Sequence, residues 1–364
     1  MKAQSRSTFQ FFKRNPCVAS YFRGGVSLHS HTMHSEESLE MLPHYVRKVP
    51  VLRRALDRQV AYAELFWTPP LSPRQAHRLE EKQIQRSFAL PALVSLTDHD
   101  SVHAGTLLRV LDRFRDAPIS TEWTVPYGST FFHLGVHNLP ATHAGGIMCE
   151  LAAFTANPDP GRLAALLADL NSYRDLLIVV NHPLWDEKRI GVGSHRRTLD
   201  ALLEKHGGAL HALELNGLRS PVENRHVINL AKVYGLPVVS GGDRHGREPN
   251  AILNLTRGST FAEFIHELRY ERQSHIVFMP QYEESLKLRT MQMVVDILRE
   301  YPENPPGRRF WAERVFYRNG QTAEPVTLAS VWPRGKAPAV FDLLSIAVRV
   351  AQWRGVQSML RVAI

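Results

Sequence analysis

The chain has 364 residues, 44% of them hydrophobic and 22% charged, which is enough apolar material for one large domain or two smaller ones. This composition excludes a disordered tail protein and a collagen-like repeat. Its two cysteines exclude a disulfide framework and a cysteine-rich zinc module. The net charge of +9 lies at the two ends, because residues 1–60 carry +6, residues 281–364 carry +4 and the body between them carries −1.

The N-terminus is basic but lacks the continuous apolar stretch of a secretory signal. No apolar run approaches the roughly 20 residues that a membrane helix needs. We therefore expect a cytoplasmic protein without a membrane partner, and the positive charge favours a partner that carries phosphate groups.

Short β-rich runs alternate with amphipathic helical stretches over residues 24–280, a pattern typical of an α/β protein with parallel strands. The predicted strands cover residues 25–29, 92–97, 119–125, 130–136, 176–181, 209–215 and 237–241. The predicted helices between them cover residues 102–114, 161–172, 198–205, 222–234 and 260–272. Seven strands in this alternation favour a (β/α) barrel over an open sheet.

Three segments lie outside this pattern: a basic N-terminal segment over residues 1–23, a mainly helical insertion over residues 42–90 and a mainly helical extension over residues 281–364. The extension is predicted to hold helices over residues 286–298 and 339–353. The second of these is too apolar to stand in water, so it needs a packing partner, either the barrel or a second copy of the chain in a homo-oligomer.

The insertion contains a clear helix start. Ser72 is a good N-cap, Pro73 suits the first helical position and Gln75 is placed to complete a capping box. The sequence that follows is polar on most faces, so we expect a surface helix or part of a lid.

The positions of the 18 histidines are more informative than their number. After the first strand, His29 and His31 alternate, so in an extended chain both imidazoles point to one side and can reach one metal ion. After the second strand, Asp98, His99 and Asp100 stand just before a helix. There the alternative interpretation is a helix N-cap beside a hydrogen-bonded histidine.

Ligand-type residues also occur on the later strands. Glu122 and His133 lie on the third and fourth, His182 follows the apolar fifth, and Asp243 and His245 repeat the i, i+2 spacing after the seventh. Active sites of parallel barrels lie at the carboxyl ends of the strands, so we expect one shared metal centre there. Histidines and carboxylates without cysteine suit Zn, Mn or Fe.

Four motifs carry a resemblance to a known family: His29-Ser30-His31-Thr32, Thr97-Asp98-His99-Asp100, His182-Pro183 and Gly242-Asp243-Arg244-His245. In this order, over residues 24–280, they resemble the stand-alone phosphoesterases of the PHP (polymerase and histidinol phosphatase) family. The resemblance implies a distorted seven-stranded (β/α) barrel that holds two or three divalent metal ions and hydrolyses phosphate esters. The metal ligands that it implies are His29, His31, Glu36, His99, Glu122, His133, His182, Asp243 and His245.

The sequence departs from the family pattern in three places, one of which is Arg244, at a position that the family often fills with a small residue. Ser27 stands where the family usually has Asp, which removes a carboxylate from behind the ligands. Ser-Glu-Glu replaces the usual Ser-Asp-Gly at residues 35–37, so the acidic ligand expected at Glu36 is one methylene longer. His34 is a rival for the same metal ion.

The implied reaction needs groups besides the ligands. We expect Asp98 and Asp100 to orient a ligand from behind, and guanidinium groups to bind phosphate. The candidates for phosphate contact are Arg196, Arg197, Arg219, Arg244 and His195, and for each the alternative is a solvated or ion-paired side chain. The expected substrate is a small phosphorylated molecule, a nucleotide or an oligonucleotide.

Two other functions stay open at this point. Metal-dependent amidohydrolases also carry a His-x-His pair on the first strand of a barrel, so they are an alternative. This alternative rests on an analogy of fold alone. The basic ends allow a nucleic-acid-binding or interaction protein with a degenerate barrel. The sequence has no zinc finger, basic zipper or other recognisable nucleic-acid motif in support of this.

Overall fold

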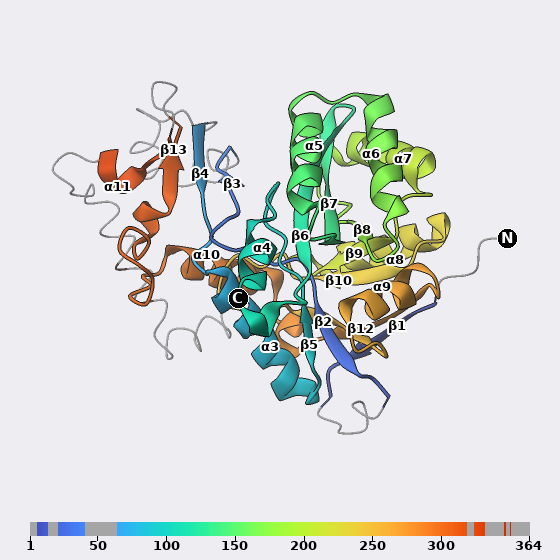
Figure 1. The fold of residues 1–364 in the computed structure, drawn as a ribbon, viewed down its shortest axis with the longest axis horizontal. Coiled ribbons are helices and arrows are strands. Elements are labelled where there is room, and N and C mark those ends of the chain that lie inside the picture. Colours follow the sequence, from blue (N-terminus) through green and yellow to red (C-terminus); the bar gives the residue numbers. More distant parts are fainter. Residues whose placement is uncertain are drawn as a thin grey trace.

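The computed structural model describes residues 6–13, 21–40, 64–318, 324–331, 346 and 350. Within them the fold is mixed α/β, with three hydrogen-bonded sheets (Figure 1). The first sheet has the order β1 (Arg6–Phe11), β12 (Gln273–Phe278), β11 (Ile252–Thr256), β2 (Gly24–Ser27) and β5 (Ala92–Val94). The second has the order β10 (Val238–Gly241), β9 (Ala212–Asn216), β8 (Leu177–Val180), β7 (Thr130–Leu139) and β6 (Ile119–Tyr127). The third has the order β14 (Val326–Thr327), β13 (Val315–Tyr317), β4 (Leu65–Trp67) and β3 (Glu37–Ser38).

The strand ladders of the described residues do not close into a barrel, but both edge strands of the second sheet, β10 and β6, are bridged to the first sheet. A single parallel bridge joins Ser30, after β2, to Arg244, after β10. A second joins His99, after β5, to Glu122 on β6. Both bridges lie where the strands end, so the two sheets come together at the same end of the molecule.

Strand β7 corrects the expectation of parallel strands. It pairs antiparallel with both of its neighbours, β6 and β8. β6 and β7 therefore form a hairpin through Gly128, which has φ +60°, with no crossover helix between them. As a result, a residue near the beginning of β7 lies at the level where the parallel strands end.

Nine α-helices are described. They are α3 (Pro73–Phe88), α4 (His103–Arg109), α5 (Ala144–Ala156), α6 (Pro160–Ser172), α7 (Val192–His206), α8 (Pro221–Tyr234), α9 (Phe261–Arg269), α10 (Leu286–Leu298) and α11 (Leu328–Val331). Three short 3₁₀ helices are η3 (Asp112–Phe114), η4 (Pro280–Glu283) and η5 (Trp311–Glu313). The single helix expected over residues 102–114 is thus divided into α4 and η3, and α7 begins at residue 192 instead of 198.

The capping box predicted for α3 is present. The Ser72 hydroxyl accepts the Gln75 backbone N–H, and the Gln75 side chain accepts the Ser72 N–H at 2.8 Å. α3 lies at the surface with Arg74, Lys82, Gln85 and Arg86 exposed, but its opposite face is buried. Ile84 packs against Gly25 of β2, and Glu80 has no exposed surface.

The largest apolar core lies between the second sheet and helices α5–α8, the group of helices at the upper right in Figure 1. Trp123 on β6 and Leu151 on α5 are completely buried in it, and the indole N–H of Trp123 donates to the Leu151 carbonyl at 3.2 Å. This packing fixes β6 to β9 rigidly, and these strands carry several of the candidate site residues.

The flanking segments differ from the expectations where they are described. Residues 6–11 of the basic N-terminal segment form β1, which pairs parallel with β12. In the extension, α10 has the predicted bounds, but β13 and β14 add strands to the third sheet. The helix predicted over residues 339–353 falls outside the described residues except for residues 346 and 350. Among the helices of the described segments, none is long and apolar enough to cross a membrane.

Candidate metal centre

A cluster of histidines and carboxylates lies where the strands of the two five-stranded sheets end. Glu122 on β6 is its centre and is completely buried. Its Oε2 atom lies 3.0 Å from His29 Nε2, 3.3 Å from His31 Nε2 and 3.4 Å from His99 Nδ1. Its Oε1 atom lies 3.2 Å from His182 Nε2 and 3.5 Å from His133 Nδ1. One carboxylate therefore faces five histidines from four chain segments.

Glu37, the first residue of β3, forms a second centre of the cluster. Its Oε2 lies 3.2 Å from His245 Nε2 and 3.3 Å from His99 Nε2, and its Oε1 lies 3.6 Å from His31 Nδ1. Asp243 closes the cluster on the β10 side, with Oδ1 3.5 Å from His31 Nε2. Oδ1 also lies 3.7 Å from both His29 Nε2 and His245 Nδ1.

These donors fit divalent metal ions. Three groups bring their ligand atoms within 4.8 Å of one another: His31 with Glu37, His99 and His245; His29 with His31 and Glu122; and His99 with Glu122 and His133. The Nε2 atom of His31 is buried and has no hydrogen-bond partner among the described residues, as expected of a nitrogen reserved for a metal ion. Burial lowers the pKa of His31 to about 4, so this ring is neutral, the form that binds metals.

The carboxylates of the cluster are held in their ionised form. Burial alone would raise the pKa of Glu122, but His29, His99 and His133 hold it well below its ordinary value. Glu37 has its pKa lowered in the same way, against burial, by His245 and His99. The same carboxylates raise the pKa of His29, His99 and His245 above the ordinary value, so without a metal ion protons on these rings balance the buried negative charge. A divalent cation bound at this place would take over that role from the protons.

The backbone at the cluster is strained. His29, His182 and Asp243 adopt positive φ angles of 61°, 27° and 51°, a region that side-chain-bearing residues rarely occupy. The chain also passes very close to its neighbours, because a Cβ atom at Gly241 would overlap the Glu214 carboxylate and one at Gly242 would overlap the Asn250 amide. Such strain concentrates at functional sites, where packing of the surrounding sheets holds it in place.

Glu214 on β9 is a functional residue that the sequence reasoning did not assign. Its Oε1 accepts the Nδ1–H of His29 at 2.5 Å, and its Oε2 accepts the backbone N–H of His182 at 2.8 Å. It therefore orients two candidate ligands from behind, as carboxylates do for metal-binding histidines. The signal was a carboxylate between two leucines in the middle of a fully buried strand.

Glu80 of α3 lies beside Ser27, where the family pattern has a carboxylate. Its Oε2 accepts the Ser27 hydroxyl at 3.0 Å and its Oε1 accepts the Arg244 Nε–H at 2.8 Å. Asn250 completes the network, because its Nδ2 donates to Ser27 Oγ at 2.6 Å. The insertion thus places a buried carboxylate behind the strand that carries His29.

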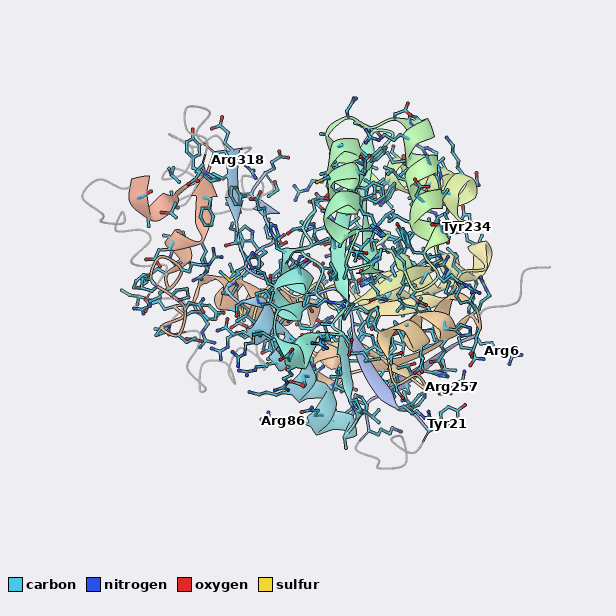
Figure 2. All side chains as sticks on the ribbon, in the orientation of Figure 1. Arg6, Tyr21, Arg86, Tyr234, Arg257 and Arg318 are labelled. Atoms are coloured by element: carbon cyan, nitrogen blue, oxygen red, sulfur yellow. The ribbon has the colours of Figure 1, made fainter. Side chains whose placement is uncertain are left out.

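The acidic ligand expected at Glu36 and its rival His34 both lie outside the cluster. Glu36 is exposed and pairs with Arg318, which Figure 2 labels at the outer end of the third sheet. The neighbouring residue Glu37 points into the cluster instead. His34 contacts the ring of His103, with 5.9 Å between centroids, and belongs to none of the three ligand groups.

Asp98 and Asp100 lie close to the cluster, but their carboxylates accept hydrogen bonds from backbone N–H groups. Asp98 accepts the backbone N–H of Thr32 at 2.5 Å and its hydroxyl at 2.7 Å, which fixes the loop after His31. Asp100 accepts the backbone N–H of Thr124 at 2.8 Å. Burial raises the pKa of Asp98 to about 7. Both residues hold the chain around candidate ligands.

Of the residues expected to bind phosphate, the structure brings Arg219 to the cluster and holds four elsewhere. Arg244 is buried in its pair with Glu80, and His195 donates to the Pro183 carbonyl at 3.0 Å. On α7, Arg196 pairs with Asp200 at 2.9 Å, and Arg197 contacts Ser194 at 3.1 Å.

Arg219 follows β9 and lies against the cluster. Its guanidinium carbon is 3.1 Å from the centre of the Trp185 ring, and its Nη2 is 3.6 Å from Asp243 Oδ2. The Nε and Nη2 atoms are buried and have no hydrogen-bond partner among the described residues. The stacked guanidinium therefore presents unused donors beside a candidate metal ligand.

No family model matches the chain, and no curated protein matches it. Three solved structures resemble it weakly. A proposed metal-dependent phosphoesterase from Bifidobacterium adolescentis shares 13% identity over 69% of this chain and 96% of its own, with a TM-score of 0.37. An amidohydrolase from Chromobacterium violaceum with bound sulfate shares 16% over 60% and 87%, with a TM-score of 0.34. PsfC from Pseudomonas syringae shares 16% over 75% and 97%, with a TM-score of 0.43. Likenesses at this level assign neither a fold nor a function to the chain.

Proposed function

We propose that the protein is a metal-dependent hydrolase that cleaves a phosphate ester. The observation that carries this proposal is Arg219 at the edge of the ligand cluster, whose Nε and Nη2 atoms are buried and form no hydrogen bond among the described residues. Their nearest carboxylates lie beyond hydrogen-bond distance, Glu223 at 3.8 Å from Nε and Asp243 at 3.6 Å from Nη2. A planar guanidinium presents paired donors that match the oxygens of a phosphoryl group. A neutral amide, the substrate of an amidohydrolase, carries no negative charge that a guanidinium at this place would bind.

The ligand cluster is proposed to hold two or three divalent ions in a PHP-type site. His29, His31, Glu122 and Asp243 would hold one, and Glu37, His99 and His245 another. His133 and His182 would hold a third with Glu122. When bound, such ions lower the pKa of water and offset the negative charge of a phosphoryl group. The ring formed by β2, β5–β10 and the two edge bridges is proposed to be a distorted seven-stranded barrel.

The chain's own residues have separate tasks in this proposal. Glu214 keeps His29 in the tautomer that has its Nδ1 protonated and its Nε2 free. Arg219 orients the phosphoryl group, and Trp185 limits the movement of its guanidinium. In the reaction, a water oxygen bonds to phosphorus as the bond to the alcohol oxygen breaks. The alcohol oxygen takes up a proton, and phosphate is released.

The test is metal content and hydrolysis of 4-nitrophenyl phosphate by wild type, His182→Ala, Asp243→Ala and Arg219→Ala. The two ligand variants should lose bound metal and more than about 100-fold of activity, because removing an outer-shell partner alone costs roughly 10–100-fold. Arg219→Ala should keep its metal and raise KM, since it removes binding of the phosphoryl group.

The matched control is Arg196→Ala, an exposed arginine of α7, which should behave as wild type. Unchanged activity in both ligand variants contradicts the metal-site proposal. Hydrolysis of an amide substrate but of no phosphate ester, with Arg219→Ala fully active, would favour the amidohydrolase instead.

A further inference from the structure

A pocket lies beside the ligand cluster and has no part in the proposed hydrolysis as described so far. Its walls are the loop after β9, the loop between β10 and β11, and α10, and it encloses about 460 Å³ of empty volume, including its open mouth. His245 belongs both to this α10 pocket and to the cluster. The α10 pocket and the cluster are therefore neighbours that share the His245 side chain.

We propose that the α10 pocket binds the alcohol portion of the phosphate ester, and that this portion is an uncharged, hydroxyl-bearing group of the sugar type. The inference rests on the proposed function for the placement of the phosphoryl group. It adds the class of alcohol and the part of the chain that selects it.

Arg244 supplies the strongest reason. Only 4% of its surface is exposed, its Nε is used by Glu80, and its Nη1 donates to the Gly246 carbonyl at 2.7 Å. The remaining nitrogen, Nη2, is buried and has no hydrogen-bond partner in the described part of the chain. An unsatisfied buried donor costs about 1–3 kcal/mol, which a ligand oxygen in the pocket would recover.

The charges around the pocket favour a neutral oxygen. Glu80 already neutralises Arg244, so that donor does not require an anion. Arg289 also lines the pocket, but its guanidinium donates to the Gly217 and Arg219 carbonyls. The carboxylates of Glu248 and Asp296 in the same wall would repel a second phosphate group. A hydroxyl group suits both kinds of neighbour, because it accepts from a guanidinium and donates to a carboxylate.

One face of α10 forms the wall of the pocket. Arg289, Gln292, Met293 and Asp296 all line it, and their spacing of i, i+3, i+4 and i+7 places them on one side of the helix. Arg289 fixes this wall, because its guanidinium donates to the Gly217 carbonyl and, at 3.3 Å, to the Arg219 carbonyl. Selection of the alcohol therefore falls to a helix outside the segment that resembles the PHP family.

The experiment fills the pocket with Met293→Trp and uses Val294→Trp as the matched control, since Val294 is the next residue of α10 and is 44% exposed. Isothermal titration of the metal-loaded protein compares ribose 5-phosphate with inorganic phosphate. Phosphate release gives kcat/KM for ribose 5-phosphate and for methyl phosphate, whose alcohol is too small to reach the pocket. A second variant, Gln292→Leu, keeps the volume and removes the amide.

Wild type should bind ribose 5-phosphate more tightly than inorganic phosphate. In Met293→Trp this preference, and the kcat/KM ratio of ribose 5-phosphate over methyl phosphate, should fall by at least about tenfold, a typical discrimination for one blocked subsite. Gln292→Leu should show a smaller fall and Val294→Trp none. Thermal unfolding of each variant shows that the fold is retained.

The inference is overturned if wild type binds ribose 5-phosphate no better than phosphate, or if Met293→Trp leaves both the preference and the ratio unchanged. A preference that Met293→Trp removes in a protein that cleaves neither ester supports the pocket and contradicts the proposed hydrolysis. Cleavage of methyl phosphate without any preference for the sugar ester supports the hydrolysis and contradicts the pocket.

Discussion

Histidines at the ligand cluster and histidines inside the sheets differ in what their ring nitrogens face. In the cluster, His29 lies between the carboxylates of Glu122 and Glu214. In the second sheet, His211 accepts the backbone N–H of Ile178 at 2.8 Å and donates to the Asn171 side chain at 2.8 Å. Both rings are buried, but carboxylates surround the first and neutral amide groups satisfy the second.

The pKa values follow from this difference. Burial lowers the pKa of His29, but Glu122 and Glu214 outweigh it and raise the pKa well above the ordinary value. Burial lowers the pKa of His211 to about 3, and no carboxylate opposes it. Burial of a histidine is therefore not by itself a sign of function, whereas a buried histidine facing several carboxylates is a candidate for metal binding.

The largest expected effect separates two adjacent glutamates. Glu37→Gln should lose more than about 100-fold in affinity for at least one divalent ion, since the change removes a ligand carboxylate and not an outer partner. Glu36→Gln should bind metal within about twofold of wild type, because Glu36 is exposed and outside the cluster. Competition with a metal chelator measures both affinities. Equal losses in the two variants would show that Glu37 is not a ligand.

A smaller effect is expected behind the ligands. Glu80→Gln leaves the buried Arg244 guanidinium uncompensated, so it should destabilise the fold by about 3 kcal/mol. It should also weaken metal binding by roughly 10-fold, because Arg244 lies between Asp243 and His245. The control is Glu81→Gln, whose partner Arg113 is exposed, and it should change stability by less than about 1 kcal/mol. Guanidinium unfolding and chelator competition measure the two quantities; a Glu80 variant as stable as the Glu81 variant contradicts the role of the pair.

The smallest effect concerns pH and the histidines within the sheets. The pKa of His211 is about 3 in the folded protein, below its ordinary value of 6.5, so its contribution is complete above pH 6.5 and is lost as the pH falls towards 3. For one such histidine the free energy of unfolding should fall by about 2 kcal/mol between pH 7 and pH 5. In His211→Gln the free energy of unfolding should decrease less between pH 7 and pH 5, by the share that His211 contributes. In His226→Gln, at an exposed position of α8, it should decrease as in wild type. Unfolding of metal-free protein at the two pH values checks this, and identical falls in wild type and His211→Gln would contradict it.

Much of the fold follows from local sequence signals. The bounds of α10 agree with the prediction, with the Ser285 hydroxyl accepting the Leu288 N–H at its start, and the Ser72 capping box at α3 is present. The direction of β7 could not be predicted, because alternation of apolar and polar residues is the same in either direction along a strand. β1 was missed because its exposed residues give it no apolar alternation, and its pairing with β12 joins distant parts of the chain.

In the candidate site, too, local spacing could be predicted from the sequence and long-range contacts could not. His29 and His31 were recognisable because their relation is set by two residues of extended chain. The choice between Glu36 and Glu37 depends on how the loop after His31 turns, which Asp98 fixes from another strand. The role of Arg244 likewise depends on Glu80, 164 residues away in sequence. Sequence patterns therefore located the cluster, but contacts between distant segments decide which neighbours belong to it.

The positive φ angles at His29, His182 and Asp243 have a consequence for how the chain can change. An L-residue in the left-handed region costs about 1–2 kcal/mol relative to glycine, so glycine at any of these positions would relieve backbone strain while deleting a candidate ligand. Selection for thermal stability alone would therefore tend to erode the cluster first. The side chains at these three positions are thus held against the preference of the backbone by the packing around the cluster.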